Sequence, residues 1–133
     1  MIYIIDYNAG NLRSVQKAVE NSGGDAIITS NSDDLKKADK IIFPGVGQFG
    51  NAAAELDRFG LREAIVEEIN KDKPVLGICV GLQLLFESSE ESENAKGLGV
   101  LPGKVVRFPK GLKVPHLGWN ELIQEKPCPL WKD

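Results

Sequence analysis

The sequence is poor in cysteine and histidine. Of its 133 residues, only Cys79 and Cys128 are cysteines, and only His116 is a histidine. Two cysteines are too few for a disulfide framework, and a reducing cytosol would keep both as thiols. A single histidine excludes a multi-histidine metal cluster. We therefore expect neither a metal site nor a cofactor.

A basic surface and a long apolar run are also missing. The 16 Lys and Arg residues are outnumbered by 19 Asp and Glu, which gives a formal net charge of -3. Nucleic acids and anionic membranes attract clustered basic residues, so neither is an expected partner. No apolar run approaches the roughly 20 residues of a membrane-spanning helix, and residues 1–6 lack the basic start of a signal peptide. The sequence predicts a cytoplasmic protein.

Four short apolar runs predict the strands of one parallel sheet. These runs are residues 2–5, 26–28, 41–43 and 75–79. Because each is continuously apolar, we expect helices to bury both faces of the sheet. Apolar residues at helical spacing predict one helix around Val15, ending near Gly23, and another around Ile65. This alternation predicts a single-domain α/β fold with right-handed crossovers.

The last part of the chain differs in composition, with more glycine and proline and shorter apolar runs. From about Glu90, glycine and proline punctuate short β-rich pieces at residues 104–108 and 121–124, which predict hairpins or edge strands. Residues 127–133 show no pattern of a closing helix or strand. We expect the fold to be incomplete at this end of the sequence.

A glycine pattern follows the third apolar run. Gly45, Gly47 and Gly50 match the G-x-G-x-x-G spacing of dinucleotide-binding loops, so nucleotide binding is one interpretation. A dinucleotide fold would place an acidic residue at the end of the next strand, where this sequence has Cys79. Pro44, directly before the glycines, instead favours a rigid turn whose backbone N–H groups point outward. Nucleotide binding is kept as the alternative.

Cys79 stands between a predicted strand and a helical stretch over residues 82–86, with Gly77 and Gly81 on either side. This is the arrangement of a nucleophile elbow with sulfur in place of the serine oxygen. The start of a helix favours a thiolate over a thiol, and the N–H of Val80 would face an oxyanion at the attacked carbonyl. The alternative is that Cys79 is a small buried apolar residue, which is the common state of a cysteine without a partner.

The remaining chemistry-bearing residues favour structural roles. Cys128 lies between Pro127 and Pro129, so no helix can activate its thiol. A thiolate nucleophile needs a general base, normally a histidine oriented by a carboxylate or amide. His116 is the one histidine, but no acid stands two positions away in its loop. A structural or interface role is the favoured interpretation of His116.

Five motifs, in one order along the chain, carry a family resemblance. They cover residues 6–14, 44–47, 77–88, 97–99 and 113–120. With these motifs the chain resembles the class I (triad) glutamine amidotransferases and, more narrowly, the glutaminase subunits of imidazole glycerol phosphate synthases. The resemblance implies a three-layer, flavodoxin-like α/β fold with helices on both faces of the sheet.

The resemblance also implies a reaction and its residues. In this family a cysteine thiolate, here Cys79, attacks the side-chain amide of L-glutamine, releases ammonia and leaves a glutamyl thioester that water hydrolyses. Gly45, Val46 and Gly47 match the oxyanion strand, which acts together with Val80. A further match, Gln83, helps hold the glutamine substrate.

A partner follows from the same resemblance. The ammonia passes to a HisF-like cyclase subunit with a (β/α)8 barrel, which makes imidazole glycerol phosphate and an aminoimidazole carboxamide nucleotide (AICAR) in histidine biosynthesis. Asn11, Trp119 and Asn120 match positions near the interface of that heterodimer. An exposed tryptophan beside glycines is also typical of a protein contact.

One feature of the family is missing. Its catalytic base and orienting acid form a His-x-Glu pair beyond the residue 113–120 motif, and the sequence reaches Asp133 without one. We therefore expect residues 1–133 to form a single, partial amidotransferase domain, shortened at its C-terminus. Two alternatives stay open: a catalytically inactive module that binds the cyclase, and a paralogous amidotransferase subunit that feeds another ammonia acceptor.

Overall fold

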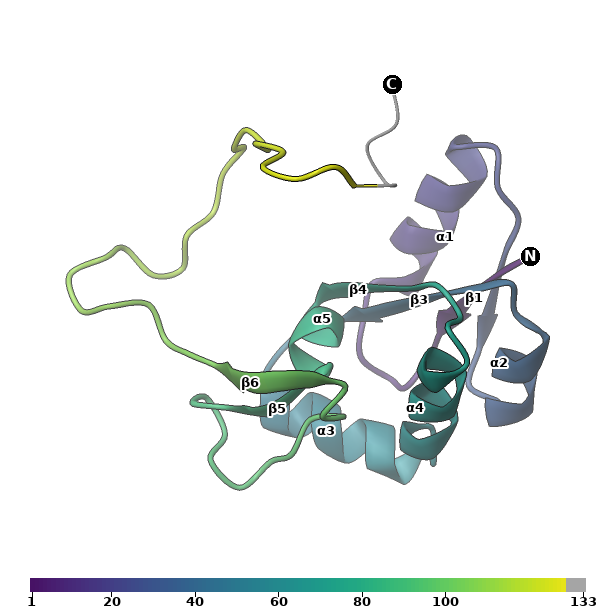
Figure 1. Ribbon diagram of the computed structural model, residues 1–133, viewed down its shortest axis with the longest axis horizontal. Helices are drawn as coiled ribbons and strands as arrows, with labels where there is room; N and C mark the ends of the chain where they lie inside the picture. The colour runs from purple at the N-terminus through teal and green to yellow at the C-terminus, as the bar shows by residue number, and fades with distance from the viewer. Residues whose placement is uncertain (129–133) are drawn as a thin grey trace.

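Strands and helices alternate along the chain in the computed structural model, which describes residues 1–128 (Figure 1). The main sheet contains β1 (Ile2–Ile5), β2 (Ala26–Thr29), β3 (Lys40–Gly45) and β4 (Val75–Cys79). All pairings are parallel, and the strand order is β2-β1-β3-β4. This is the flavodoxin-like order, and the predicted parallel α/β sheet is confirmed.

The helices lie on both faces of this sheet. They are α1 (Leu12–Asn21), α2 (Ser32–Lys37), α3 (Phe49–Arg58), α4 (Arg62–Asn70) and the short α5 (Val80–Leu84). Helix α1 covers one face, while α2, α3 and α4 cover the other (Figure 1). The predicted three-layer arrangement is therefore confirmed, although the sequence patterns had not indicated α2 or α3.

The main hydrophobic core lies between the sheet and helices α2, α3 and α4. Phe43 of β3 is fully buried there and belongs to one hydrophobic cluster with Leu35, Leu56 and Ile65, one from each of the three helices. Helix α3 faces this core because Phe49, Ala52, Ala53 and Leu56 recur at helical spacing. The well-packed side of the sheet is thus the side that carries α3.

The opposite face of the sheet is less covered, which corrects an expectation. Helix α1 has no fully buried residue. On β4, Leu76 and Ile78 are 48% and 38% exposed, and they line a groove of about 530 Å³ together with α1. The prediction that every apolar strand is buried on both faces is therefore wrong for β4 within residues 1–128. Helix α1 makes its main contacts with β1 and β2, so it leaves this face of β4 uncovered.

A small second sheet follows the main one. Its strands β5 (Phe86–Ser89) and β6 (Leu101–Val105) pair in parallel. The predicted helix over residues 82–86 is wrong beyond Leu84, because the Leu98 N–H binds the Leu84 carbonyl at 2.6 Å and Phe86 already belongs to β5.

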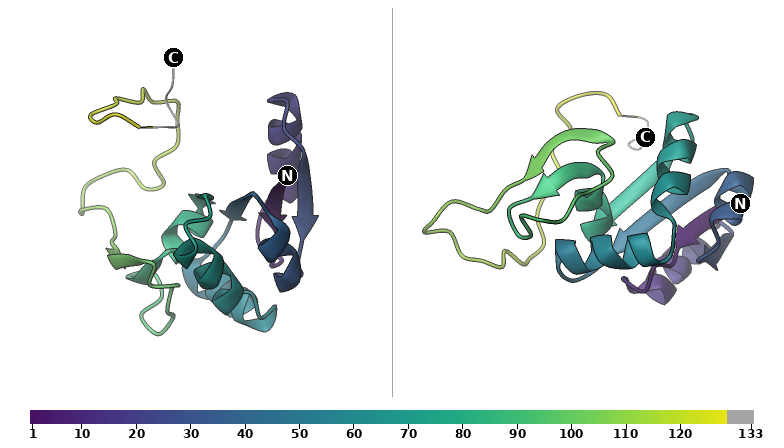
Figure 2. Two further views of the ribbon diagram at one scale, coloured as in Figure 1. Left: turned by 45° about the vertical axis from the view of Figure 1, so that its right-hand side comes forward. Right: turned by 90° about the horizontal axis from the view of Figure 1, so that it is seen from below.

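The C-terminal stretch departs furthest from the predicted strands. Of residues 104–108, only 104 and 105 are in a strand; that strand is an edge strand, as one alternative predicted, and it pairs in parallel with β5, so the hairpin alternative is wrong. Residues 121–124 form no strand, since all of residues 106–127 are exposed and no neighbouring strand satisfies their backbone groups. This segment leads outward from β6 and then turns back above the main sheet as a long open loop (Figures 1 and 2). Residues 129–133, the end of the predicted pattern-free tail, lie outside the described residues.

Every helix within residues 1–128 is too short or too polar to span a membrane.

Candidate active site

The candidate site lies where the parallel strands β1, β3 and β4 end. Gly45, the last residue of β3, is paired in register with Cys79, the last residue of β4. The chain leaving β1 leads to β2 on one side, and the chain leaving β3 leads to β4 on the other side, so the carboxyl ends of β1 and β3 form a topological switch point. In open α/β sheets, ligands bind at this edge.

Cys79 has the backbone geometry of a nucleophile elbow. It forms the junction between β4 and α5, with φ of 56° and ψ of -119°. A positive φ at a residue with a side chain stores strain of order 1–3 kcal/mol, which the surrounding structure must hold. The thiol is exposed, so the alternative of a small buried residue is wrong. Helix α5 has only five residues, so its dipole is weaker than the predicted longer helix would supply.

Glycines allow α5 to pack directly on the backbone of neighbouring strands. A Cβ added at Gly81 would collide with the carbonyl oxygen of Phe43, and one at Gly77 would lie 2.7 Å from the Cα of Leu82. A Cβ at Gly45 would collide with the Tyr7 hydroxyl and lie 2.7 Å from the Gly81 nitrogen. The elbow therefore depends on three glycines at which a larger side chain has no room.

Tyr7 is a site residue that sequence reasoning missed. It is fully buried, packs against the Phe43 ring at 5.4 Å between centroids, and donates its hydroxyl to the Pro44 carbonyl at 2.8 Å. Burial, with a smaller contribution from Cys79, raises the pKa of the Tyr7 phenol well above its ordinary value. Tyr7 therefore stays neutral and fixes the peptide that precedes Gly45. The contact between Tyr7 and Pro44 joins residues 37 positions apart, so no local sequence pattern predicts it.

The predicted oxyanion residues lie in two segments beside Cys79. Gly45 and Val80 are buried and close together, because a Cβ at Gly45 would be 3.1 Å from the Val80 Cβ. Val46 and Gly47 are exposed on the loop that leaves β3. Among the hydrogen bonds of residues 1–128, none is donated by the backbone N–H of Gly47 or Gln48. These two backbone donors are therefore unbonded within residues 1–128.

The other predicted residues divide into near and remote ones. Gln83 is half-buried on α5, one turn after Cys79. Asn11 caps α1, where its side chain accepts the Ser14 N–H at 3.4 Å. Trp119 is fully exposed in the segment of residues 106–127.

The single histidine lies in the same segment and not at the elbow. The Asn120 side-chain amide lies 3.3 Å from Nε2 of His116 and donates to the Gly118 carbonyl at 3.4 Å. Within residues 1–128, no hydrogen bond joins His116 to Cys79. No three His, Cys, Asp or Glu side chains in the same range gather as a metal site would require.

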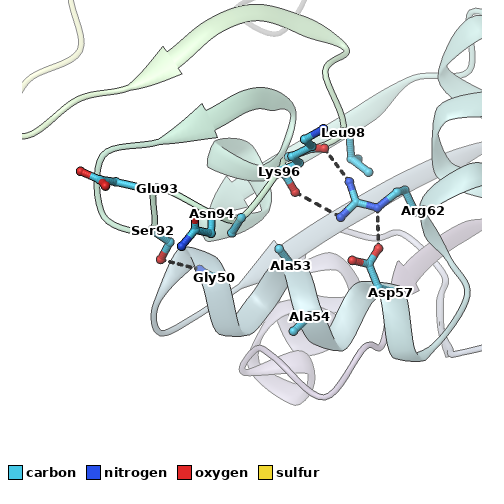
Figure 3. Close-up of a pocket in the computed structure, with 12 residues that line it drawn as sticks. Gly50, Ala53, Ala54, Asp57, Arg62, Ser92, Glu93, Asn94, Lys96 and Leu98 are labelled. Carbon is cyan, nitrogen blue, oxygen red and sulfur yellow. Dashed lines mark hydrogen bonds and ion pairs between the residues drawn. The ribbon is translucent and has the colours of Figure 1, made fainter.

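A hollow of about 800 Å³ lies between α3 and residues 92–98, and Cys79 does not line it (Figure 3). The Arg62 guanidinium crosses its wall and donates to Asp57 and to the carbonyls of Lys96 and Gly97 at 2.5 to 3.1 Å. These bonds engage the three nitrogen atoms of the Arg62 guanidinium. They hold residues 96 and 97 against the start of α4.

Comparisons with known proteins agree with the predicted resemblance. Residues 7–114 match the CobB/CobQ-like glutamine amidotransferase domain. The chain is 52% identical to imidazole glycerol phosphate synthase subunit HisH from Methanothermobacter thermautotrophicus, over 92% of this chain and 61% of the relative. It is also 52% identical to the HisH proteins of Desulfitobacterium hafniense and Methanocaldococcus jannaschii, over 98% and 99% of this chain and 62% and 66% of the relatives. The chain therefore spans less than two thirds of the length of these relatives.

Solved structures show the same fold at low sequence identity. A crystal structure of a glutamine amidotransferase superposes with a TM-score of 0.71 at 20% identity, over 86% of this chain and 60% of that one. A putative peptidase E from Listeria monocytogenes superposes with a TM-score of 0.62 at 20% identity, over 75% of this chain and 62% of that one. The predicted flavodoxin-like amidotransferase fold is confirmed. By its sequence match over residues 7–114, the chain belongs to the CobB/CobQ-like glutamine amidotransferase family.

Proposed function

We propose that this chain carries the nucleophile of a glutaminase that supplies ammonia to a cyclase subunit in histidine biosynthesis. One observation carries the proposal: Cys79 is exposed in a strained backbone conformation at the end of β4. The 52% identity to HisH subunits supports the choice of reaction. In this proposal, residues 1–133 form a single, partial amidotransferase domain.

The proposed chemistry begins with the Cys79 thiolate. Its sulfur attacks the side-chain carbonyl carbon of L-glutamine, and the carbonyl oxygen becomes an oxyanion. We assign the stabilisation of this oxyanion to the N–H of Val80 and the peptides of Gly45, Val46 and Gly47, which lie in the two segments beside the sulfur. The general acid–base group delivers a proton to the nitrogen, the C–N bond breaks, and ammonia leaves with a glutamyl thioester behind; water then attacks the thioester, which releases glutamate and the Cys79 sulfur. Gln83, one turn along α5, is proposed to hold the substrate.

The general base is proposed to lie outside the described residues. The His116 ring is hydrogen-bonded to the Asn120 side chain, and no hydrogen bond joins it to Cys79 within residues 1–128. The family resemblance puts the His-x-Glu pair beyond the residue 113–120 motif, and the relatives are longer than this chain. Loss of one triad member commonly lowers turnover by orders of magnitude. We therefore propose turnover for the protein that includes such a pair.

The proposed partner is a HisF-like cyclase with a (β/α)8 barrel, which would use the ammonia to make imidazole glycerol phosphate and AICAR. The printed name of the relatives, subunit of imidazole glycerol phosphate synthase, supports this choice. Asn11, Trp119 and Asn120 are proposed interface residues, and all three are exposed. The cytoplasmic location stays a prediction.

The test is glutamine hydrolysis by the protein at its natural length, with the cyclase subunit present. Cys79→Ala should abolish ammonia release and leave binding to the cyclase unchanged, whereas Cys128→Ala should preserve both. Ammonia release that survives Cys79→Ala would exclude Cys79 as the nucleophile. Binding without ammonia release in the parent protein would favour the inactive binding module, and ammonia release without imidazole glycerol phosphate would favour another acceptor.

A further inference from the structure

Backbone pairing between β1 and β3 ends before the two strands reach the candidate site. Their last pair within residues 1–128 is Ile4 with Ile42, whereas β3 and β4 stay paired as far as Gly45 and Cys79. Over its last two residues, β3 therefore has a neighbouring strand only on its β4 side. The sheet thus opens between β1 and β3 at the edge where the candidate site lies.

Tyr7 lies at this opening, just after the end of β1. Its side chain is fully buried, and its hydroxyl donates to the Pro44 carbonyl at 2.8 Å. Pro44 is itself buried and has no N–H, so its carbonyl is the backbone group of this residue that needs a partner. The phenol therefore supplies the hydrogen bond that a longer β1 strand would otherwise make.

The Tyr7 oxygen fits closely against Gly45 and the start of α5. A Cβ added at Gly45 would collide with this oxygen, would lie 2.7 Å from the Gly81 nitrogen and would lie 3.1 Å from the Val80 Cβ. Gly45 is also paired in register with Cys79. The hydroxyl, the peptides around Gly45 and the first residues of α5 are thus packed together, so a shift of one part moves the others.

Contacts on both sides hold Tyr7 in place. Its ring packs against Phe43 with 5.4 Å between the ring centroids. The next residue, Asn8, has a φ of 64°, donates its N–H to the Asp6 carboxylate at 3.0 Å and donates its side-chain amide to Glu55 of α3 at 3.2 Å. Burial raises the pKa of the Tyr7 phenol, so the hydroxyl stays protonated and remains a donor at ordinary pH. Its hydrogen bond is therefore a fixed feature of the fold.

We propose that Tyr7 is a positioning residue for the glutaminase reaction: by bonding the Pro44 carbonyl, it sets where the peptides of residues 45–47 lie relative to the Cys79 sulfur. This inference rests on the proposed glutaminase function for its catalytic meaning. Tyr7 acts through the backbone of β3, so it affects the formation of the oxyanion and not the binding of glutamine.

Amide hydrogen exchange in the protein at its natural length tests the bond without reference to activity. Tyr7→Phe removes the hydroxyl and keeps the ring. Exchange in a peptide covering residues 43–50 should then become about fivefold faster, since the loss of one buried hydrogen bond opens its segment to that extent. Thr29→Val is the matched control at the end of β2, because it removes another buried hydroxyl, which donates to Asp34 at 2.8 Å. It should leave exchange over residues 43–50 unchanged. Unchanged exchange there in Tyr7→Phe would overturn the proposal.

The labelling rate of Cys79 tests the positioning role. A glutamine-shaped chloromethyl ketone forms an oxyanion before sulfur displaces chloride, whereas iodoacetamide reacts with the same sulfur without forming one. Tyr7→Phe should lower the rate with the ketone about tenfold, because the oxyanion donors are displaced rather than removed, and should leave the rate with iodoacetamide unchanged. Thr29→Val should change neither rate, and nor should Tyr3→Phe, which removes the tyrosine hydroxyl within β1. A purely structural role would change the two reagents equally, and that result would overturn the proposal.

Steady-state kinetics with the cyclase present separate positioning from substrate binding. Tyr7→Phe should lower kcat for glutamine hydrolysis about tenfold and leave KM unchanged, which is the pattern of an interaction made only in the transition state. A raised KM with an unchanged kcat would indicate that Tyr7 contributes to glutamine binding, and would overturn the positioning role. If the parent protein reacts with iodoacetamide but not with the ketone, the proposed function fails and the catalytic role of Tyr7 fails with it. The exchange measurement still decides whether Tyr7 holds residues 43–50.

Discussion

The two faces of the main sheet differ in how completely helices cover them. Against α2, α3 and α4, Phe43, Leu56 and Ile65 are fully buried. On the α1 face, Leu76 of β4 is 48% exposed beside a groove. The contacts around Cys79 lie on the covered side of the sheet. They are the glycines of the elbow and the Tyr7 hydrogen bond. The candidate site is therefore built on the well-packed layer, and the α1 face contributes little to holding Cys79 in place.

Matched leucine substitutions test this difference most strongly. Leu56→Ala should destabilise the protein by about 3 kcal/mol, because it removes a fully buried side chain and leaves a cavity. Leu76→Ala should cost less than about 1 kcal/mol, since nearly half of that side chain already contacts water. Urea unfolding of both variants measures the two values. Equal losses would show that the α1 face is as tightly packed as the other face.

A second prediction concerns the glycine on which α5 packs. Gly81→Ala should destabilise the protein by about 2–3 kcal/mol and slow the labelling of Cys79, because the new Cβ would displace α5 from the Phe43 carbonyl. Gly23→Ala is the control. Its Cβ would meet no atom within 4 Å, although its φ of 80° makes it cost about 1 kcal/mol. Unchanged labelling in Gly81→Ala would contradict the account of the elbow.

The third prediction is the smallest and depends on pH. Glu68 of α4 is 2% exposed and pairs with Lys73 at 2.5 Å and Lys71 at 3.0 Å. The bond from Lys73, followed by that from Lys71, lowers the pKa of Glu68 from its ordinary value of 4.5. Because the pKa of Glu68 is lower in the folded than in the unfolded protein, its ionisation stabilises the fold at any pH above the unfolded-state pKa. This stabilisation is lost as the pH falls through the folded-state pKa.

Glu68→Gln should therefore cost about 1–2 kcal/mol at neutral pH, and the difference from the parent should shrink below pH 4.5. Asp33→Asn is the control on the surface, because Asp33 pairs with Lys36 while 70% of its side chain is exposed. Its unfolding midpoint should barely change, since exposed ion pairs contribute little. Unfolding midpoints from pH 3 to pH 7 measure both; a pH-independent difference for Glu68→Gln would contradict the pairing.

The sequence predicted the sheet well because parallel strands have a local signature. The apolar runs at residues 2–5 and 75–79 form β1 and β4 with the predicted bounds. The glycines on either side of Cys79 correctly indicated the sharp turn between β4 and α5. Helix α3 was missed, although its apolar spacing is helical, because the glycines before it drew the interpretation toward a loop. The strand predicted at residues 121–124 failed because a β-rich composition does not supply a neighbouring strand.

Contacts between distant residues could not be read from local patterns. Tyr7 binds Pro44, and Glu91 binds the Phe49 amide across 42 positions. Neither pair has a recognisable spacing, since each depends on where the fold brings two segments together. The contacts that support residues 44–50 therefore emerged only from the structure, whereas the elbow geometry at Cys79 could be predicted from Gly77, Cys79 and Gly81.

The central claim is that Cys79 is a nucleophile in a site that accepts glutamine. The most direct measurement is the rate at which the glutamine-shaped chloromethyl ketone labels each cysteine, followed by intact mass and peptide mapping. The account predicts labelling of Cys79 that L-glutamine slows and that Cys128→Ala leaves unchanged. Labelling that L-glutamine does not slow, or that falls equally on Cys128, would contradict it.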